Sequence, residues 1–430
     1  YDGQMIGKVA VGAGRVNVHD VPRIFWTRRI ELKVDDCESQ IGPLGQLIGC
    51  VCLVARGDPK VFILSVRIVA HRVERAILDF VIVAIDPRDG SIIALASVPS
   101  FDPNAFSGGL SRSQYAALRD DENRPLFNRA ILGGYEPGST LKPFIALAAL
   151  ELEVTTPDRQ IFSSGSFQLS PNSRPYRDWR KGGHGWVNVE QALEQSVNTY
   201  FYQMGLDLGI DNMSDYLAPF GFGERTGLDM LGENRGVLPS RPWKRGQFGQ
   251  PWYPGETVIA AIGQGFNVVT PVQLATALSA LVNGGTRYSP RLLFASKRAG
   301  DEQAQRINAP VATTIPMRNE ANWDVVEEGM RLVVHGSAGT ARAIAPESGM
   351  QIAGKSGTAQ VVAQSTDTDR QSADTAEHLR HHALFIAYAP FTNPGIVVAT
   401  VVEHGGGGSS QAAPVARAVI DAWFSQEMLP

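Results

Sequence analysis

The stretch "GGYEPGSTLKPFIALAAL", residues 133–150, decides where the first long helix of the chain begins. Its apolar second half consists of good helix formers, which predict a helix. Pro143 cannot lie deep inside that helix, because it lacks an N–H group and its ring clashes with the preceding turn. The helix therefore begins close to Ser139, after the Pro-Gly turn. Ser139 and Lys142 are then separated by three positions and face the same way.

A serine at this position has both a chemical and a purely structural interpretation. At a helix start, Ser139 lies among the unpaired N–H groups at the positive end of the helix dipole, which suits a nucleophile whose reaction creates an oxyanion. Lys142 precedes a proline and is biased away from the α region, which opposes a helix at that position. Taken alone, the stretch favours the structural interpretation, a serine N-cap with a surface lysine.

The remaining hydrophobic patterns predict an α+β protein. Residues 80–97 read as two strands joined by the turn "DPRDG", which is a hairpin. Residues 188–209 form one strong helical stretch, and residues 412–424 close the chain as an amphipathic helix. Three further strands are expected late in the chain, at residues 350–362, 383–390 and 395–403. This order predicts an antiparallel sheet flanked by helices.

Composition limits the class of protein. The chain has 430 residues, enough for one large domain with a smaller one, and its net charge of −4 gives no indication of nucleic-acid binding. No stretch of about 18 apolar residues is present. The three cysteines lie within the first 52 residues and define neither a zinc site nor a disulfide framework. We expect no cofactor.

Three short motifs occur in order along the chain. Ser139-x-x-Lys142 is followed by two Ser-x-Asn matches, at residues 170–172 and 196–198, and by Lys355-Ser-Gly-Thr in a predicted strand. Serine acyl-transfer enzymes of the penicillin-binding and β-lactamase type carry this set. The match at 170–172 lies in a Pro/Ser/Asn stretch typical of a turn, whereas the match at 196–198 lies in the predicted helical segment, so we favour the second.

Longer stretches share this similarity. The segments "YEPGSTLKPF", "GHGWVNVEQALEQSVNTYFYQMG", "GFGERTGLDM", "WYPGET", "IGQGFNVVTPVQLA" and "GKSGTAQV" resemble the transpeptidase domain of class B penicillin-binding proteins, in particular the elongation type, penicillin-binding protein 2. The resemblance implies a penicillin-binding/serine β-lactamase-like fold over residues 76–430. It fades toward the N-terminus, where residues 1–75 are expected to be part of a pedestal or linker region.

The resemblance implies roles for the motif residues. Ser139 would attack the carbonyl of the penultimate D-alanine of a stem peptide, and Lys142 would take its proton. Ser196 would pass a proton to the leaving amine, and Asn198 would hold the peptide amide. The N–H groups of Ser139 and Thr358 would form the oxyanion hole.

The third motif would complete the site. Lys355 would be a second cation near Lys142, which helps to lower the pKa of that lysine. Ser356, Gly357 and Thr358 would bind the terminal carboxylate of the substrate. Terminal D-alanine would leave, and an amine from a neighbouring stem peptide would form the cross-link in peptidoglycan. β-Lactams would acylate Ser139, because their strained amide imitates the dipeptide.

The family also implies partners and a location. The partners would be stem peptides ending in D-Ala-D-Ala, β-lactam antibiotics, a membrane glycan polymerase and an elongation-complex scaffold. The catalytic domain would lie in the bacterial periplasm, held to the inner membrane by an anchor absent from this sequence. Two alternatives stay open: a serine β-lactamase or D,D-carboxypeptidase with fast deacylation, and a β-lactam sensor or scaffold that does not turn over.

A metal site is a further candidate, at Asp178 and His184 in "YRDWRKGGHGW". Some relatives resemble this loop and bind zinc there. Zinc needs about four ligands, and this chain has Ser163 and Val197 where the others would be expected. A structural loop with a hydrogen-bonded histidine is the favoured interpretation, so we predict no metal.

Overall fold

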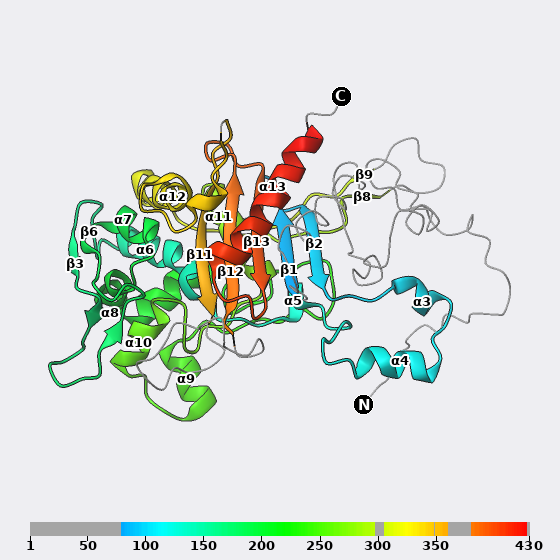
Figure 1. Ribbon diagram of the computed structural model, residues 1–430, viewed down its shortest axis with the longest axis horizontal. Helices are drawn as coiled ribbons and strands as arrows, with labels where there is room; N and C mark the ends of the chain where they lie inside the picture. Colours follow the sequence, from blue (N-terminus) through cyan, green and yellow to red (C-terminus); the bar gives the residue numbers. More distant parts are fainter. Residues whose placement is uncertain (1–78, 297–304, 348, 360–379, 428–430) are drawn as a thin grey trace.

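A central sheet organises the protein, as the computed structural model describes it for residues 79–296, 305–347, 349–359 and 380–427. Its five strands are β1 (Phe80–Ile85), β2 (Ile92–Val98), β11 (Ala353–Ala359), β12 (His382–Ala389) and β13 (Ile396–Val402). They lie in the order β11-β12-β13-β1-β2, and every neighbouring pair is antiparallel. An early hairpin and three late strands therefore lie side by side (Figure 1).

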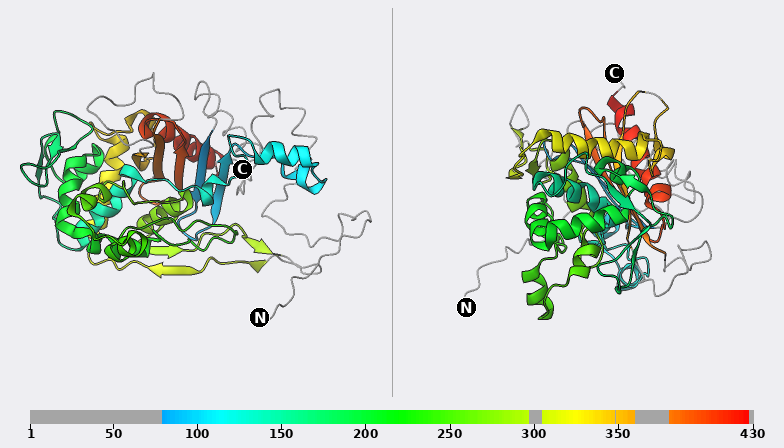
Figure 2. Two further views of the ribbon diagram at one scale, coloured as in Figure 1. Left: turned by 90° about the horizontal axis from the view of Figure 1, so that it is seen from below. Right: turned by 90° about the vertical axis from the view of Figure 1, so that its left-hand side faces the viewer.

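The two faces of the sheet are covered by different helices. Because side chains alternate along a strand, β1 sends Val81 and Val83 into one apolar cluster and Ile82 and Ala84 into another. The first cluster includes the long central helix α11 (Pro271–Val282), and the second includes the C-terminal helix α13 (Ala413–Glu427). Figures 1 and 2 show α13 crossing one face, with α11 on the other.

A lobe of helices lies beyond strand β11, at one edge of the sheet (Figure 1). Its members are α6 (Lys142–Glu151), α7 (Val189–Glu194), α8 (Asn198–Leu217), α10 (Pro254–Ala260) and α12 (Glu320–His335). Every residue of α6 is buried, and α6 packs on α8. Helix α12 lies against both α7 and β11, so it joins the lobe to the sheet edge.

Shorter elements connect these two parts. The short helices are α3 (Pro103–Ser107), α4 (Arg112–Arg119), α5 (Arg129–Leu132), η2 (Gly138–Leu141), η3 (Ala218–Phe220), α9 (Arg241–Phe248), η4 (Arg342–Ile344) and η6 (Gly408–Ala412). The short strands are β3 (Ile161–Ser163), β4 (Ser166–Phe167), β5 (Tyr176–Arg177), β6 (Gly185–Val187), β7 (Thr286–Tyr288), β8 (Ala295–Ser296), β9 (Gln305–Arg306) and β10 (Val311–Thr314). No helix in the described ranges is long and apolar enough to span a bilayer.

The predicted antiparallel sheet flanked by helices is confirmed, including the early hairpin and the three late strands. One expected element is wrong in detail. Residues 188–209 were predicted as one helical stretch, but the chain breaks into α7 and α8 at Ser196, whose φ of +56° is not helical. The expected pedestal region, residues 1–75, and its boundary at residue 76 lie outside the described residues.

Candidate active site

Ser139 lies in the 3₁₀ turn η2, which leads directly into α6. The N–H of Lys142 donates to the carbonyl of Ser139, so the two residues are one turn apart. Lys142 adopts the α conformation (φ −56°, ψ −38°) although Pro143 follows it. The surrounding lobe thus overrides the local bias before proline, and the helix begins where the sequence predicts.

Two glycines let this turn touch strand β11. Gly138 has a φ of +51°, and a Cβ atom there would lie 2.5 Å from the carbonyl oxygen of Thr358. A Cβ atom on Gly357 would lie 2.7 Å from Thr140 Cγ2. Any side chain at either position would push the turn and the strand apart. The glycines of the first and third motifs therefore bring Ser139 beside the backbone of Thr358.

The Lys142 ammonium is fully buried between α6 and the start of α8. Nζ donates to the carbonyl oxygen of Ser196 at 2.8 Å, to Ser196 Oγ at 3.3 Å and to Asn198 Oδ1 at 2.7 Å. Among the described residues, none of its hydrogen bonds goes to Ser139. Burial lowers the pKa of Lys142 to about 7, against the opposing attraction of the Asp178 carboxylate. A lysine with such a pKa can release its proton and act as a base near neutral pH.

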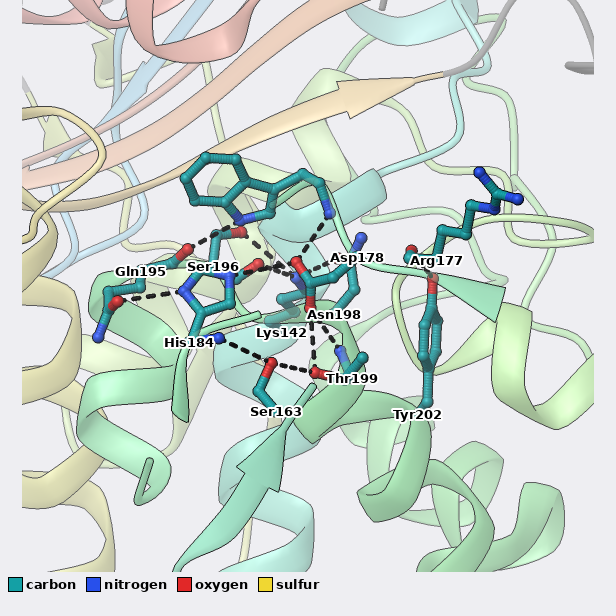
Figure 3. Close-up of polar contacts among 11 residues, drawn as sticks. Lys142, Ser163, Arg177, Asp178, His184, Gln195, Ser196, Asn198, Thr199 and Tyr202 are labelled. Carbon is teal, nitrogen blue, oxygen red and sulfur yellow. Dashed lines mark hydrogen bonds and ion pairs between the residues drawn. The ribbon is translucent and has the colours of Figure 1, made fainter. Parts of the chain in front are cut away.

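Ser196 owes its position to the break between the two helices. Its N–H donates to the carbonyl of Leu193 at 3.2 Å, and the N–H of Val197 donates to Ala192 at 2.9 Å, which ends α7. Helix α8 then begins at Asn198. The left-handed φ of Ser196 is rare for a residue with a side chain. This turn directs both its carbonyl and its hydroxyl at Lys142 (Figure 3).

Strand β11 supplies a second buried lysine, Lys355. Burial lowers its pKa well below the ordinary value, and repulsion from the Lys142 ammonium lowers it further. Its neighbour Ser356 has its hydroxyl 3.2 Å from Thr340 Oγ1. Thr340 follows α12, and its N–H donates to the Glu194 carbonyl at the end of α7. Sequence analysis missed Thr340, because no motif spacing links it to β11.

The competing Ser-x-Asn match does not reach this site. Residues 170–172 are exposed, and the Ser173 N–H donates to the Ser170 carbonyl at 2.9 Å, which closes a local turn. The Ser173 hydroxyl also donates to that carbonyl. The structure thus brings Ser139, Lys142, Ser196, Asn198 and the Lys355 strand together, and it leaves Ser170 and Asn172 outside.

Asp178 and His184 lie beside the start of α8, with fully buried side chains. Asp178 Oδ1 lies 3.3 Å from His184 Nε2. The Ser163 hydroxyl lies 2.6 Å from Thr199 Oγ1, and the side chain of Val197 has no atom that could bind a metal. Over the ranges that the structure describes, no three His, Cys, Asp or Glu side chains are arranged to hold a metal ion. The residues therefore do not fit a zinc site.

Comparison with known proteins gives concordant results. Residues 80–421 match the family model described as the penicillin binding protein transpeptidase domain. Peptidoglycan D,D-transpeptidase MrdA of Haemophilus influenzae is 40% identical over 347 residues, which cover 81% of this chain and 53% of that protein. The same-named protein of Escherichia coli K12 is 41% identical over 329 residues, covering 76% and 51%. The chain thus spans about half the length of these relatives.

A solved structure agrees with the sequence comparison. Pseudomonas aeruginosa PBP2, solved in complex with WCK 5153, is 42% identical to this chain and superposes with a TM-score of 0.74. The match covers 88% of this chain and 79% of that one. The two proteins are therefore similar in fold as well as in sequence.

Proposed function

Since the chain belongs to the penicillin-binding protein transpeptidase family, we propose that it is the catalytic part of an elongation-type peptidoglycan D,D-transpeptidase. Its substrate is a stem peptide ending in D-Ala-D-Ala, and its product is a peptide cross-link. One observation carries the proposal. The buried Lys142 amine, with its pKa near 7, is held by Ser196 and Asn198 one helical turn from Ser139.

Acylation begins at Ser139. In its neutral form, Lys142 Nζ has a free lone pair and accepts the proton of the Ser139 hydroxyl as the oxygen attacks the penultimate D-alanine carbonyl. The N–H groups of Ser139 and Thr358 stabilise the oxyanion, each contributing about 2.7–4 kcal/mol to lowering the barrier. The proximity of Gly138 to the Thr358 backbone supports this pairing of donors.

Departure of the leaving group requires a proton on its amine. Ser196 Oγ, 3.3 Å from Lys142 Nζ, relays the proton to the amine of terminal D-alanine as the peptide bond breaks. Asn198 holds the substrate amide. Lys355, with the hydroxyls of Ser356 and Thr358 on the same strand, binds the terminal carboxylate. An amine of a second stem peptide then attacks the acyl-enzyme and releases Ser139.

The partners and the location follow from the same proposal. The catalytic domain works in the bacterial periplasm, beside the inner membrane, where peptidoglycan is built. A glycan polymerase and an elongation scaffold are its protein partners, and β-lactams acylate Ser139. The similarity to PBP2 of Helicobacter pylori, whose structure was solved in complex with MreC, supports a protein partner of this kind. That chain is 29% identical, with a TM-score of 0.73, and the match covers 86% of this chain and 64% of that one.

A fluorescent penicillin tests the proposed nucleophile. We expect one adduct, mapped by peptide mass spectrometry to Ser139 and persisting for many minutes, with no adduct on Ser139→Ala. An adduct on Ser196 or Ser356 would contradict the assignment. Rapid multiple-turnover hydrolysis of nitrocefin would favour a β-lactamase instead.

The acyl acceptor is tested with a stem peptide ending in D-Ala-D-Ala and an amine acceptor. Release of D-alanine with formation of the cross-linked product is the expected result. Release of D-alanine with hydrolysed peptide alone would indicate a carboxypeptidase. Failure to release D-alanine from a protein that still labels with penicillin would favour a sensor.

A further inference from the structure

A buried polar network surrounds the start of α8, and Asp178 lies at its centre (Figure 3). Asp178 Oδ2 accepts hydrogen bonds from the N–H of Thr199 at 2.9 Å and from its hydroxyl at 3.1 Å. The other oxygen, Oδ1, accepts the N–H of Trp179 at 2.8 Å and lies 3.3 Å from His184 Nε2. One carboxylate thus joins the loop before β6 to the first turn of α8.

The same loop also holds the residue that precedes Ser196. Trp179 Nε1 donates to the carbonyl oxygen of Gln195 at 3.0 Å, and His184 Nδ1 lies 3.1 Å from Gln195 Oε1. Gln195 and Thr199 bracket the Ser-x-Asn segment in sequence. Both ends of that segment are therefore fixed to the loop around Asp178. A tether at each end restrains the strained turn at Ser196, whose φ is +56°.

The Asp178 carboxylate is ionised at neutral pH. Burial disfavours its charge, but the hydrogen bonds from His184 and the Thr199 N–H, together with the positive charges of Lys142 and His184, hold the pKa of Asp178 below its usual range. Its charge acts on the Lys142 ammonium and raises the pKa of Lys142, opposing the effect of burial. Lys355 on β11 also interacts electrostatically with Lys142. His184, in the same loop as Asp178, lies beside the Asp178 carboxylate.

We propose that Asp178 is a positioning residue of the acyl-transfer site: its carboxylate clamps the turn that carries Ser196 and Asn198, and its charge balances the buried ammonium of Lys142. The inference rests on the proposed function, because it assigns Lys142 as the base. The network ties the loop to α8 through the hydrogen bonds between Asp178 and Thr199.

Two variants separate the two roles of Asp178. Asp178→Asn keeps the shape but removes the charge, so the protonated form of Lys142 becomes less favourable. We expect the acid limb of the acylation pH profile to move to lower pH by roughly half to one unit, and the maximal rate to fall about tenfold or more. Thr199→Val keeps the charge and removes one hydroxyl, so the rate should fall about threefold with the limb unmoved.

A matched control is available on the same helix. Asp211 lies on α8, and its exposed carboxylate pairs with Arg241 at 2.8 Å. Asp211→Asn removes one negative charge from the surface of α8 and should change neither the rate nor the limb. The measurement is the rate of penicillin acylation from pH 5 to 9, on protein shown to be folded by circular dichroism and thermal melting.

The outcomes distinguish this inference from the proposed function. Folded Asp178→Asn with a wild-type rate and an unmoved limb would overturn the inference, while wild-type labelling at Ser139 would leave the function standing. If wild-type protein failed to label, the function itself would be rejected. If Asp178→Asn did not fold, Thr199→Val would decide: a slower rate with an unmoved limb supports the clamp, and an unchanged rate refutes it.

Discussion

Two buried lysines, Lys244 and Lys142, differ in the groups that contact their ammonium. Lys244 on α9 forms an ion pair with Glu256 on α10, and its ammonium lies 4.5 Å from the ring centre of Tyr253. Lys142 is equally buried, but its hydrogen bonds go to three oxygens that carry no charge, on Ser196 and Asn198.

The difference lies in what compensates for the lost hydration of each charge. At Lys244, a carboxylate in contact balances the ammonium, and the pair joins two helices. At Lys142, the Asp178 carboxylate acts through its charge and forms no hydrogen bond with the ammonium. Burial therefore destabilises the protonated form more than Asp178 stabilises it, and the pKa falls to about 7. A lysine deprived of a contacting carboxylate is suited to give up and take back a proton.

Exchanging each lysine for arginine tests this contrast most strongly. Lys142→Arg should slow penicillin acylation by on the order of 10²–10⁴-fold, because a guanidinium stays protonated and cannot act as a base. Lys244→Arg keeps a cation for Glu256 and should retain a rate within about threefold of wild type. Stopped-flow labelling of both folded variants gives the two rates. Wild-type acylation by Lys142→Arg would refute the base assignment.

The pH profile of the wild-type protein sharpens the contrast further. Acylation needs neutral Lys142, whose pKa is about 7, so the rate should fall below that pH and be roughly 100-fold lower at pH 5. The check is the acylation rate constant at constant ionic strength between pH 5 and 9. A rate that still rises about tenfold per pH unit up to pH 9 would show that burial does not lower this pKa.

Lys142 has the amide oxygen of Asn198 where Lys244 has a carboxylate, and removing this acceptor should change the acylation rate less than replacing the lysine does. Asn198→Ala removes the Oδ1 atom 2.7 Å from Nζ and should slow acylation by about tenfold or more, since the base loses its fixed position. Asn172→Ala, in the exposed competing match, is the control and should leave the rate nearly unchanged. The reverse pattern of rate constants would show that residues 170–172 form the second motif.

The smallest expected effect is on the free energy of unfolding, which should rise when Lys142 is replaced by an apolar residue and fall when Lys244 is. The pKa of Lys142 is lowered in the folded state, from 10.5 to about 7. Stability is therefore lost as pH falls between those values and stays reduced below 7. Lys142→Met should raise the free energy of unfolding at pH 6 by about 1 kcal/mol, because it removes this penalty. Lys244→Met should lower it by about 1–2 kcal/mol, because Glu256 loses its partner.

Chemical denaturation at pH 6 and pH 10 measures both effects. The gain from Lys142→Met should shrink at the higher pH, where the unfolded chain also begins to lose the proton from this lysine. A loss of stability at pH 6 would mean that the three hydrogen bonds of Nζ outweigh the cost of burying its charge.

The sequence by itself determined the sheet and the position of Ser139 and Lys142 at the start of α6. Short apolar runs predicted the late strands, and two such runs around the turn "DPRDG" predicted the hairpin, because both signals are local in the sequence. Pro143 and the apolar run after it placed the helix start at Ser139, since a proline is tolerated only in the first turn. The order of three motifs added Lys355 and its neighbours without any knowledge of distance.

Tertiary structure alone decided the rest. The sequence could not show that the chain breaks at Ser196, because the residues before it, 191–195, are good helix formers. The break is held by the loop around Asp178, which is distant in sequence. It could not show that Thr340 meets Ser356, since these residues belong to different elements. The pKa of Lys142 also depends on how completely neighbouring segments exclude water. Desolvation depends on the packing of the whole fold, so it cannot be predicted from the spacing of motifs in the sequence.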